Sequence, residues 1–226
     1  MKTLWVLQHT EAEYLGLIED HLEGRAVRFR YFRPFAAGGM VPETMGTADG
    51  LILLGGGPYG VVSGHILPSL GAELRLTRAA LAAGLPVFGI GLGALILCVA
   101  GGGGVAEAPL RFGVEEMTIS GWHDAAPQKM PLACYLRDAA LPSPEMPVIG
   151  RGRDGAVLAF TVGAKSLALL GHAGMKRGMA EDLIMEFAET PDDTLTGLAA
   201  LGREQHAIAA ALGPFMTALT GHCGWM

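Results

Sequence analysis

The sequence has few charged residues, few cysteines and no long apolar segment, and each shortage excludes a class of protein. Only 17% of the 226 residues are charged and 50% are hydrophobic, which excludes an intrinsically disordered chain. The net charge is −6 and no basic surface is evident, so nucleic acid is not an expected partner. A chain of this length can bury a large core without disulfides, and we expect a single domain over residues 1–226.

The three cysteines, Cys98, Cys134 and Cys223, lie far apart and show no spacing typical of a metal site or a disulfide framework. The apolar residues 4–7 are far too few for a signal peptide or a membrane span. These features predict a cytoplasmic protein with free thiols and no membrane partner. They leave open whether the chain forms a homo-oligomer.

Strand and helix signals alternate in the first half of the chain. The sequence predicts strands at residues 3–8, 27–31 and 51–54, helices at 11–22 and 67–83, and then a fourth strand and a helix within 85–97. Such alternation is typical of an α/β fold. We expect a Rossmann-like, mostly parallel sheet with helices on both faces.

The pattern changes after residue 104. Residues 110–119 and 157–170 predict shorter strands that form a small antiparallel extension. Residues 125–147 contain five prolines and no sustained periodicity, which predicts a long surface excursion or lid. Two further helices are expected at 181–188 and 206–219, with an acidic loop at 191–193 between them.

Residues 85–97 combine a short apolar strand, a glycine-rich turn and a helix. Small residues around a sharp turn are typical of a nucleophile elbow, in which one strained residue stands above the carboxyl edge of a parallel sheet. Gly91 occupies the position of that residue, and Gly89 and Gly93 flank it. Glycine has no side chain that could act as a nucleophile.

Motifs along most of the chain resemble those of the class I glutamine amidotransferases. The elbow resembles the family's Gly-x-Cys-x-Gly motif, with glycine in place of cysteine. Further similar segments are Leu7-Gln8-His9 with Glu13 and Gly16, the oxyanion loop Gly55-Gly56-Gly57-Pro58, the glycine pair 101–102, the hairpin 111–113, and Gly171-His172-Ala173-Gly174 in place of a strand ending in His-Pro-Glu. The resemblance implies a class I glutamine amidotransferase-like fold.

The resemblance also implies that the catalytic groups are incomplete. In the family a cysteine attacks the glutamine amide, a histidine transfers protons and a glutamate orients the histidine. Here Gly91 replaces the cysteine, Gly174 replaces the glutamate, and only His172 is retained. We therefore expect a protein that cannot hydrolyse glutamine by its own residues, and the sequence leaves open whether it is an enzyme.

The same resemblance predicts that the pocket at the elbow still binds a ligand. Backbone amides at the oxyanion loop and at a helix N-terminus can receive an anion or a polarised oxygen without any nucleophile. We expect a ligand, an ion or ordered solvent in contact with Gly57, Leu92 and His172. The pocket is expected to serve a small molecule or a protein partner, with no dedicated cofactor, although a metal ion remains possible. The predicted binding residues are Gly56, Gly57, Pro58, Gly91, Leu92 and Gly93.

Two alternatives to this prediction use other side chains. His9 and His172 are both expected at the carboxyl edge of the sheet and could hold copper or zinc for a different chemistry, with residues 222–226 as a further source of soft ligands. A working amidotransferase would instead need a thiol from elsewhere. Cys98 is expected to point into the core, and nothing in the sequence places Cys134 at the elbow.

Residues 89–94 also match the Gly-x-Gly-x-x-Ala pattern of dinucleotide-binding folds. That fingerprint normally follows the first strand, with an acidic residue at the end of the next strand. Here it follows the fourth strand, and the sequence therefore favours an elbow over a dinucleotide site.

Overall fold

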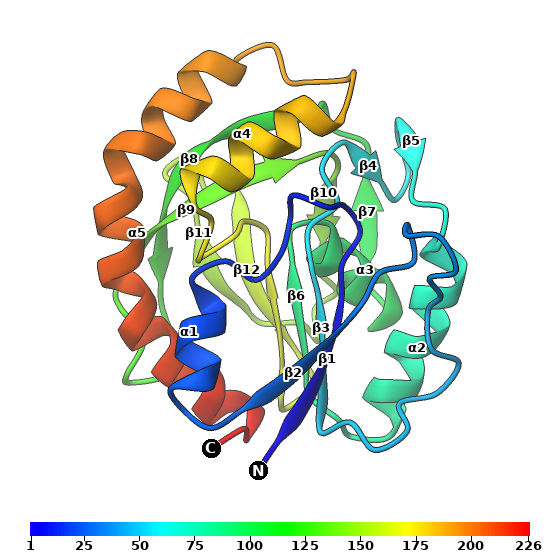
Figure 1. Cartoon of the computed structure of the whole chain (residues 1–226). Helices are drawn as coiled ribbons and strands as arrows, with labels where there is room; N and C mark the ends of the chain where they lie inside the picture. Colours follow the sequence, from blue (N-terminus) through cyan, green and yellow to red (C-terminus); the bar gives the residue numbers. More distant parts are fainter.

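The computed structural model describes all residues from 1 to 226, and its central element is a nine-stranded mixed sheet (Figure 1). The strand order is β2-β1-β3-β6-β13-β12-β11-β8-β9. Neighbours from β2 to β13 are parallel, and neighbours from β13 to β9 are antiparallel. The strands are β1 (Thr3–Leu7), β2 (Arg28–Phe32), β3 (Gly50–Leu53), β6 (Val87–Ile90), β8 (Arg111–Ile119), β9 (Lys129–Leu136), β11 (Val148–Arg151), β12 (Val157–Val162) and β13 (Ser166–Leu169).

Helices cover both faces of this sheet, as the sequence predicts. In Figure 1, α1 and α5 lie on one face, α2 and α3 lie on the other, and α4 crosses near the top. No helix combines the length and the apolar character that crossing a membrane requires. The helices are α1 (Ile18–Glu23), α2 (Leu70–Ala82), α3 (Leu92–Ala100), α4 (Arg177–Glu186) and α5 (Thr194–Cys223), and two small sheets pair β4 (Tyr59–Gly60) with β5 (His65–Ile66) and β7 (Gly104–Ala106) with β10 (Ala139–Leu141).

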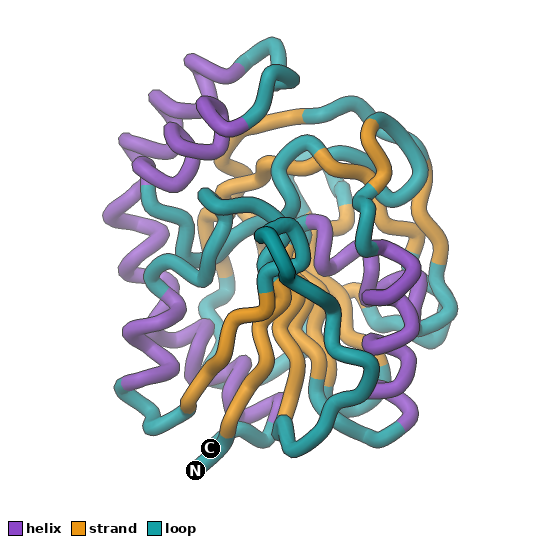
Figure 2. The backbone as a smooth tube through the Cα atoms, turned by 45° about the vertical axis from the view of Figure 1, so that its right-hand side comes forward, coloured by secondary structure: helices purple, strands orange, loops and turns teal.

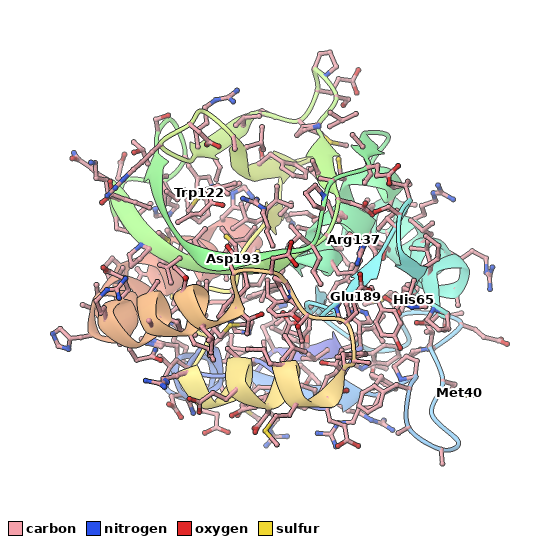
Figure 3. The ribbon with its side chains drawn as sticks, turned by 90° about the horizontal axis from the view of Figure 1, so that it is seen from above. Met40, His65, Trp122, Arg137, Glu189 and Asp193 are labelled. Carbon is pink, nitrogen blue, oxygen red and sulfur yellow. The ribbon has the colours of Figure 1, made fainter.

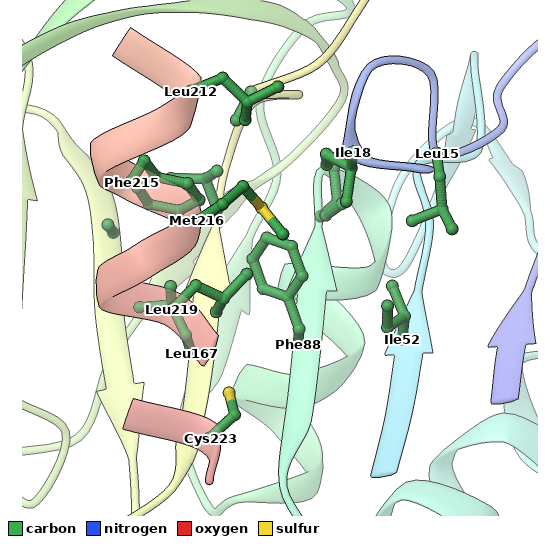
Figure 4. Close-up of a cluster of buried hydrophobic side chains, with 14 of the residues drawn as sticks. Leu15, Ile18, Ile52, Phe88, Leu167, Leu212, Phe215, Met216, Leu219 and Cys223 are labelled. Carbon is green, nitrogen blue, oxygen red and sulfur yellow. The ribbon is translucent and has the colours of Figure 1, made fainter. Parts of the chain in front are cut away.

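The central parallel strands are apolar along their whole length because both of their faces are covered. Every residue of β3 and β6 is buried. Figure 4 shows one of the two faces, where Phe88 of the sheet packs against Phe215 and Met216 of α5, and Ile52 belongs to the same buried cluster. Burying one such side chain contributes about 1.5–3 kcal/mol, so these contacts hold α5 against the sheet.

The edge strand β2 has the alternating pattern expected of a strand with one solvated face. Arg28 and Arg30 are exposed, and Phe29 and Tyr31 are half-buried. The chain termini lie together at the lower end of the molecule, whereas long loops gather at the upper end, above the carboxyl ends of the parallel strands (Figure 2). That upper edge carries the candidate site.

The predicted surface excursion at 125–147 is wrong. Its first part forms β9, which pairs with β8 along its full length and is mostly buried, and its second part contributes β10. β9 is the outermost strand of the sheet. Proline is tolerated on an edge strand because one side of the strand needs no hydrogen bond, so Pro131 does not interrupt it.

The observed helix boundaries differ most from the predicted ones at the two ends of the chain. The helix predicted at 11–22 is reduced to α1, because Gly16 has a left-handed φ of +61° and the N–H of Leu17 donates to the carbonyl of Gly174. α5 extends the helix predicted at 206–219 in both directions and includes Pro214. The helix ends at Cys223 within the tail at 222–226, and Cys223 and Trp225 are buried in the core.

Candidate functional site

Gly91 lies in a strained turn between β6 and α3, at the position that the sequence assigns to the elbow. Its φ is 54° and its ψ is −116°, a conformation that other residues seldom adopt. The N–H of Gly91 donates to the carbonyl of Leu169 at 2.8 Å. A Cβ atom placed on Gly91 would meet nothing nearer than the Cα of Gly55 at 3.4 Å and Oε1 of Glu13 at 4.0 Å. The turn therefore has room for a small side chain.

The carboxyl group of Glu13 lies against the oxyanion loop. Its Oε2 accepts the N–H of Gly57 at 2.9 Å, and the side chain is buried. A Cβ atom on Gly55 would lie 1.7 Å from Oε1, so the carboxyl group packs directly over the backbone of that glycine. The N–H of Glu13 donates to Oγ1 of Thr10 at 3.1 Å, which holds the turn after β1. The amide of Gly57, which was expected to bind a ligand, therefore already donates to a side chain of the protein.

The other backbone groups of the predicted pocket are also engaged. The N–H of Gly93 donates to the carbonyl of Leu54 at 3.0 Å. A Cβ atom on Gly56 would lie 2.2 Å from Cδ2 of Leu92, so the leucine side chain packs on the loop. The carbonyl of Pro58 accepts a hydrogen bond from Nε of Arg137 at 3.0 Å. Glu13 and Leu92 therefore pack against the groups that were expected to contact a ligand at the elbow.

His172 is held by three hydrogen bonds, none of which goes to the elbow or the oxyanion loop. Its Nε2–H donates to the carbonyl of Tyr14 at 2.7 Å, and its Nδ1 accepts the N–H of Gly174 at 3.1 Å. Its backbone N–H donates to the carbonyl of Ala133 at 2.8 Å. Burial lowers the pKa of His172 to about 4, against the raising effect of the Tyr14 carbonyl. The ring is neutral with one fixed tautomer.

Gly174 has little space for the glutamate that the resemblance would place there. A Cβ atom would lie 3.0 Å from both the N and Cγ1 atoms of Ile18 and 3.2 Å from the carbonyl oxygen of Leu15. The strand end carrying His172 and Gly174 therefore packs tightly against the turn before α1. Its role in this chain is to hold that turn.

His9 and Glu73 form a buried ion pair next to the oxyanion loop. Nε2 of His9 lies 2.8 Å from Oε2 of Glu73, both side chains are fully buried, and Nδ1–H donates to the carbonyl of Gly55 at 2.9 Å. Burial alone would lower the pKa of His9, but the charge and hydrogen bond of Glu73 raise it above its usual value. Burial would raise the pKa of Glu73, but His9 lowers it. Both nitrogens of His9 face acceptors, so the ring is an imidazolium.

The pKa of Glu13 is also strongly perturbed. Burial raises it to about 7, while the hydrogen bond from Gly57 and the charge of His9 act in the opposite direction and Glu186 adds to the increase. Near neutral pH, both protonation states of Glu13 are therefore populated.

The segment at the C-terminal end of α4 covers the oxyanion loop. The rings of Phe187 and Tyr59 meet edge to face with their centroids 5.6 Å apart. A Cβ atom on Gly57 would lie 3.0 Å from Leu183 and 3.1 Å from Phe187. Arg137 pairs with Glu189 of the same segment, and Figure 3 shows these two side chains close together.

A pocket of about 300 Å³ opens beside the covered site. It lies at the carboxyl ends of β1 and β2 and the start of α2, and His9 is part of its wall. Its other lining residues include Phe35, Met40, Tyr59 and Ala72, so most of the wall is apolar. A larger groove of about 500 Å³ between β8, β9 and α5 contains none of the predicted site residues.

The comparisons with known proteins point to a fold. No protein-family model matches the sequence, and no curated protein matches it significantly. The structure of a glutamine amido transferase from Methylobacillus flagellatus superimposes with a TM-score of 0.80 at 20% identity, covering 100% of this chain and 95% of the other. A glutamine amidotransferase from Thermotoga maritima gives 0.78 at 19% identity, with 98% of each chain covered. The chain has the class I glutamine amidotransferase-like fold.

None of the thiols in this glutamine amidotransferase-like chain is placed to replace the missing nucleophile. Cys98, Cys134 and Cys223 are all buried and unpaired. Burial raises the pKa of each thiol, to about 12 for Cys134. Cys134 lies behind Gly171, where a Cβ atom would be 2.8 Å from its sulfur. These thiols are therefore poor nucleophiles at neutral pH.

The side chains do not fit the copper or zinc site that His9 and His172 suggested. Both nitrogens of each ring already take part in hydrogen bonds. No group of three or more histidine, cysteine, aspartate or glutamate side chains is arranged to hold a metal ion.

Glu13 is the site residue that sequence reasoning missed. The motif after β1 included it as part of the resemblance, but no role followed from its position. The available signal was an acidic residue in the turn that directly follows a mostly buried strand. A buried carboxylate needs a partner, and that partner could have been sought among the free amides of the oxyanion loop.

Proposed function

We propose that this protein is a non-hydrolysing member of the glutamine amidotransferase-like fold that binds a small molecule at the carboxyl edge of its sheet. The observation that carries the proposal is the occupied oxyanion loop. Gly91 supplies no nucleophile, and the N–H of Gly57 already donates to Glu13. A glutamine amide would find neither an attacking group nor this free donor.

The environment of His172 supports the same conclusion. A nucleophile needs a base within hydrogen-bonding reach, and the base needs a group that orients it. His172 directs Nε2–H to Tyr14 and Nδ1 to Gly174, and it is neutral. Its hydrogen bonds fix the ring for a structural role in the turn before α1.

Hydrolysis can be tested directly on the wild-type protein and on Gly91→Cys. We expect no glutamine-dependent ammonia release from either, and no labelling of wild-type residue 91 by glutamine-analogue electrophiles. A bacterial glutaminase assayed in parallel shows that the assay works. A turnover on the order of 1 s⁻¹, which is ordinary for enzymes, would overturn the proposal.

The pocket beside His9 is the proposed binding site. It is concave, largely apolar and adjacent to a charged imidazole, which are features of small-molecule sites. It also lies outside the carboxyl ends of the parallel strands, where ligands bind in open α/β sheets.

Binding there can be tested by thermal-shift screening of a metabolite collection. Compounds that stabilise the wild type should fail to stabilise Ala72→Phe, in which the new ring fills the pocket. Ala82→Phe, an exposed position on the same helix, is the matched control and should respond as the wild type does. Equal responses of both variants would exclude this pocket.

A further inference from the structure

The oxyanion loop holds a carboxyl group supplied by the chain itself. Oε2 of Glu13 lies 2.9 Å from the amide nitrogen of Gly57, and only 2% of the residue is exposed. Oε1 of the same group lies 4.0 Å from the position of a Cβ atom on Gly91. The carboxyl group therefore lies between the loop and the elbow.

The surroundings of this group are suited to a carboxyl group of any source. The glycine backbone at Gly55 leaves space that a side chain would fill, since a Cβ atom there would clash with Oε1. The Gly57 amide supplies a hydrogen-bond donor, and the charge of His9 favours the ionised form of Glu13. Backbone donors and a nearby cation together recognise carboxylates.

A second observation points to the same interior region. The hydroxyl group of Tyr135 is buried without any hydrogen-bond partner, although only 3% of the residue is exposed. Burial, and then the negative charge of Glu13, raise the pKa of Tyr135, which places the phenol within electrostatic reach of this carboxyl group. Buried polar groups are rarely left unpaired, so the region has an unused donor.

We infer that the oxyanion loop is a carboxyl-binding site that Glu13 keeps occupied, and that a small free carboxylic acid binds there once the Glu13 side chain is shortened. In the wild type, the Glu13 side chain therefore excludes other carboxylates from the loop. The inference rests on the proposed function insofar as it treats the elbow as closed to glutamine. Leu183 and Phe187 cover the loop, so only a small ligand fits.

Acetate is the matching probe. Glu13→Ala removes a methylene and a carboxylate, and these are the heavy atoms of one acetate ion. A free acetate ion can therefore restore the missing group without any other change in the protein.

The experiment compares thermal unfolding in sodium acetate and in sodium chloride of equal ionic strength at pH 7.5. For Glu13→Ala we expect a saturable rise in Tm of about 3–5 °C when acetate reaches about ten times its Kd. The wild type and Glu13→Gln should not respond, because their own side chains fill the site. Glu204→Ala, which removes an exposed carboxylate of α5, should not respond either.

If Glu13→Ala is unfolded in sodium chloride, its refolding from urea is measured instead. Recovery of the native circular dichroism spectrum in acetate but not in chloride supports the inference. Failure of acetate to rescue Glu13→Ala while Glu13→Gln folds overturns it, as does an equal acetate response of the wild type. Ammonia release by the wild type would overturn the proposed function alone, so the two failures are distinguishable.

Discussion

Glu13→Gln should stabilise the protein above neutral pH and leave its stability nearly unchanged near pH 4. The pKa of Glu13 is raised from an ordinary value of 4.5 to about 7, mainly by burial. Between these two values the folded protein holds a proton that the unfolded chain has released. Raising the pH through this window therefore favours the unfolded state, and the penalty is complete above pH 7.

The size of the penalty follows from the difference between the two pKa values. One pKa unit corresponds to 1.36 kcal/mol, so an ionised Glu13 destabilises the fold by about 3 kcal/mol above pH 7. Glutamine remains neutral at every pH and keeps an oxygen for the N–H of Gly57. We expect the variant to gain up to about 3 kcal/mol at pH 8.5, or about 6–12 °C in Tm for a chain of this size.

Other buried groups also titrate, but the wild type and Glu13→Gln both contain them. The pKa of His172 is lowered to about 4, so its contribution to stability is lost as the pH falls from 6.5 toward 4. The charged groups His9 and Glu186 act on Glu13 itself, and Tyr135 is its titratable neighbour on β9. The difference between variant and wild type at each pH isolates the Glu13 contribution.

The assay is urea unfolding followed by circular dichroism from pH 4 to 9, with Glu204→Gln as an exposed control on α5. The free-energy difference between Glu13→Gln and the wild type should rise between pH 4.5 and 7 and then level off. A difference that does not change with pH, or a variant that is less stable than the wild type at pH 8.5, would refute the reasoning.

Three further substitutions test the surrounding structure. Gly91→Ala should cost about 1–2 kcal/mol in urea unfolding, because the positive φ is strained for alanine although a Cβ atom meets nothing nearer than 3.4 Å. His9→Phe should cost about 3–5 kcal/mol by leaving Glu73 buried without its partner, and a smaller loss in His9→Phe with Glu73→Leu would identify the unpaired charge as the cause. Arg137→Met should speed amide hydrogen exchange over residues 187–193, because it removes the pair with Glu189, and unchanged exchange would show that the ring contacts alone hold this segment.

The sequence alone determined the fold and the elbow. Both depend on local patterns: apolar strands alternate with amphipathic helices, and the glycine-rich turn joins β6 directly to α3. The same local reasoning failed at β9, because prolines mask a strand whose pairing with β8 depends on its place at the edge of the sheet.

Only the tertiary structure decided what occupies the site. Glu13 meets the amide of Gly57 across 44 residues of sequence, and His9 meets Glu73 across 64. Neither pair has a local signature, because a carboxylate of the same type is ordinarily solvated on the surface. These residues are buried and hydrogen-bonded only when β1, β3 and α2 pack together. The closed and charged site therefore depends on the tertiary structure.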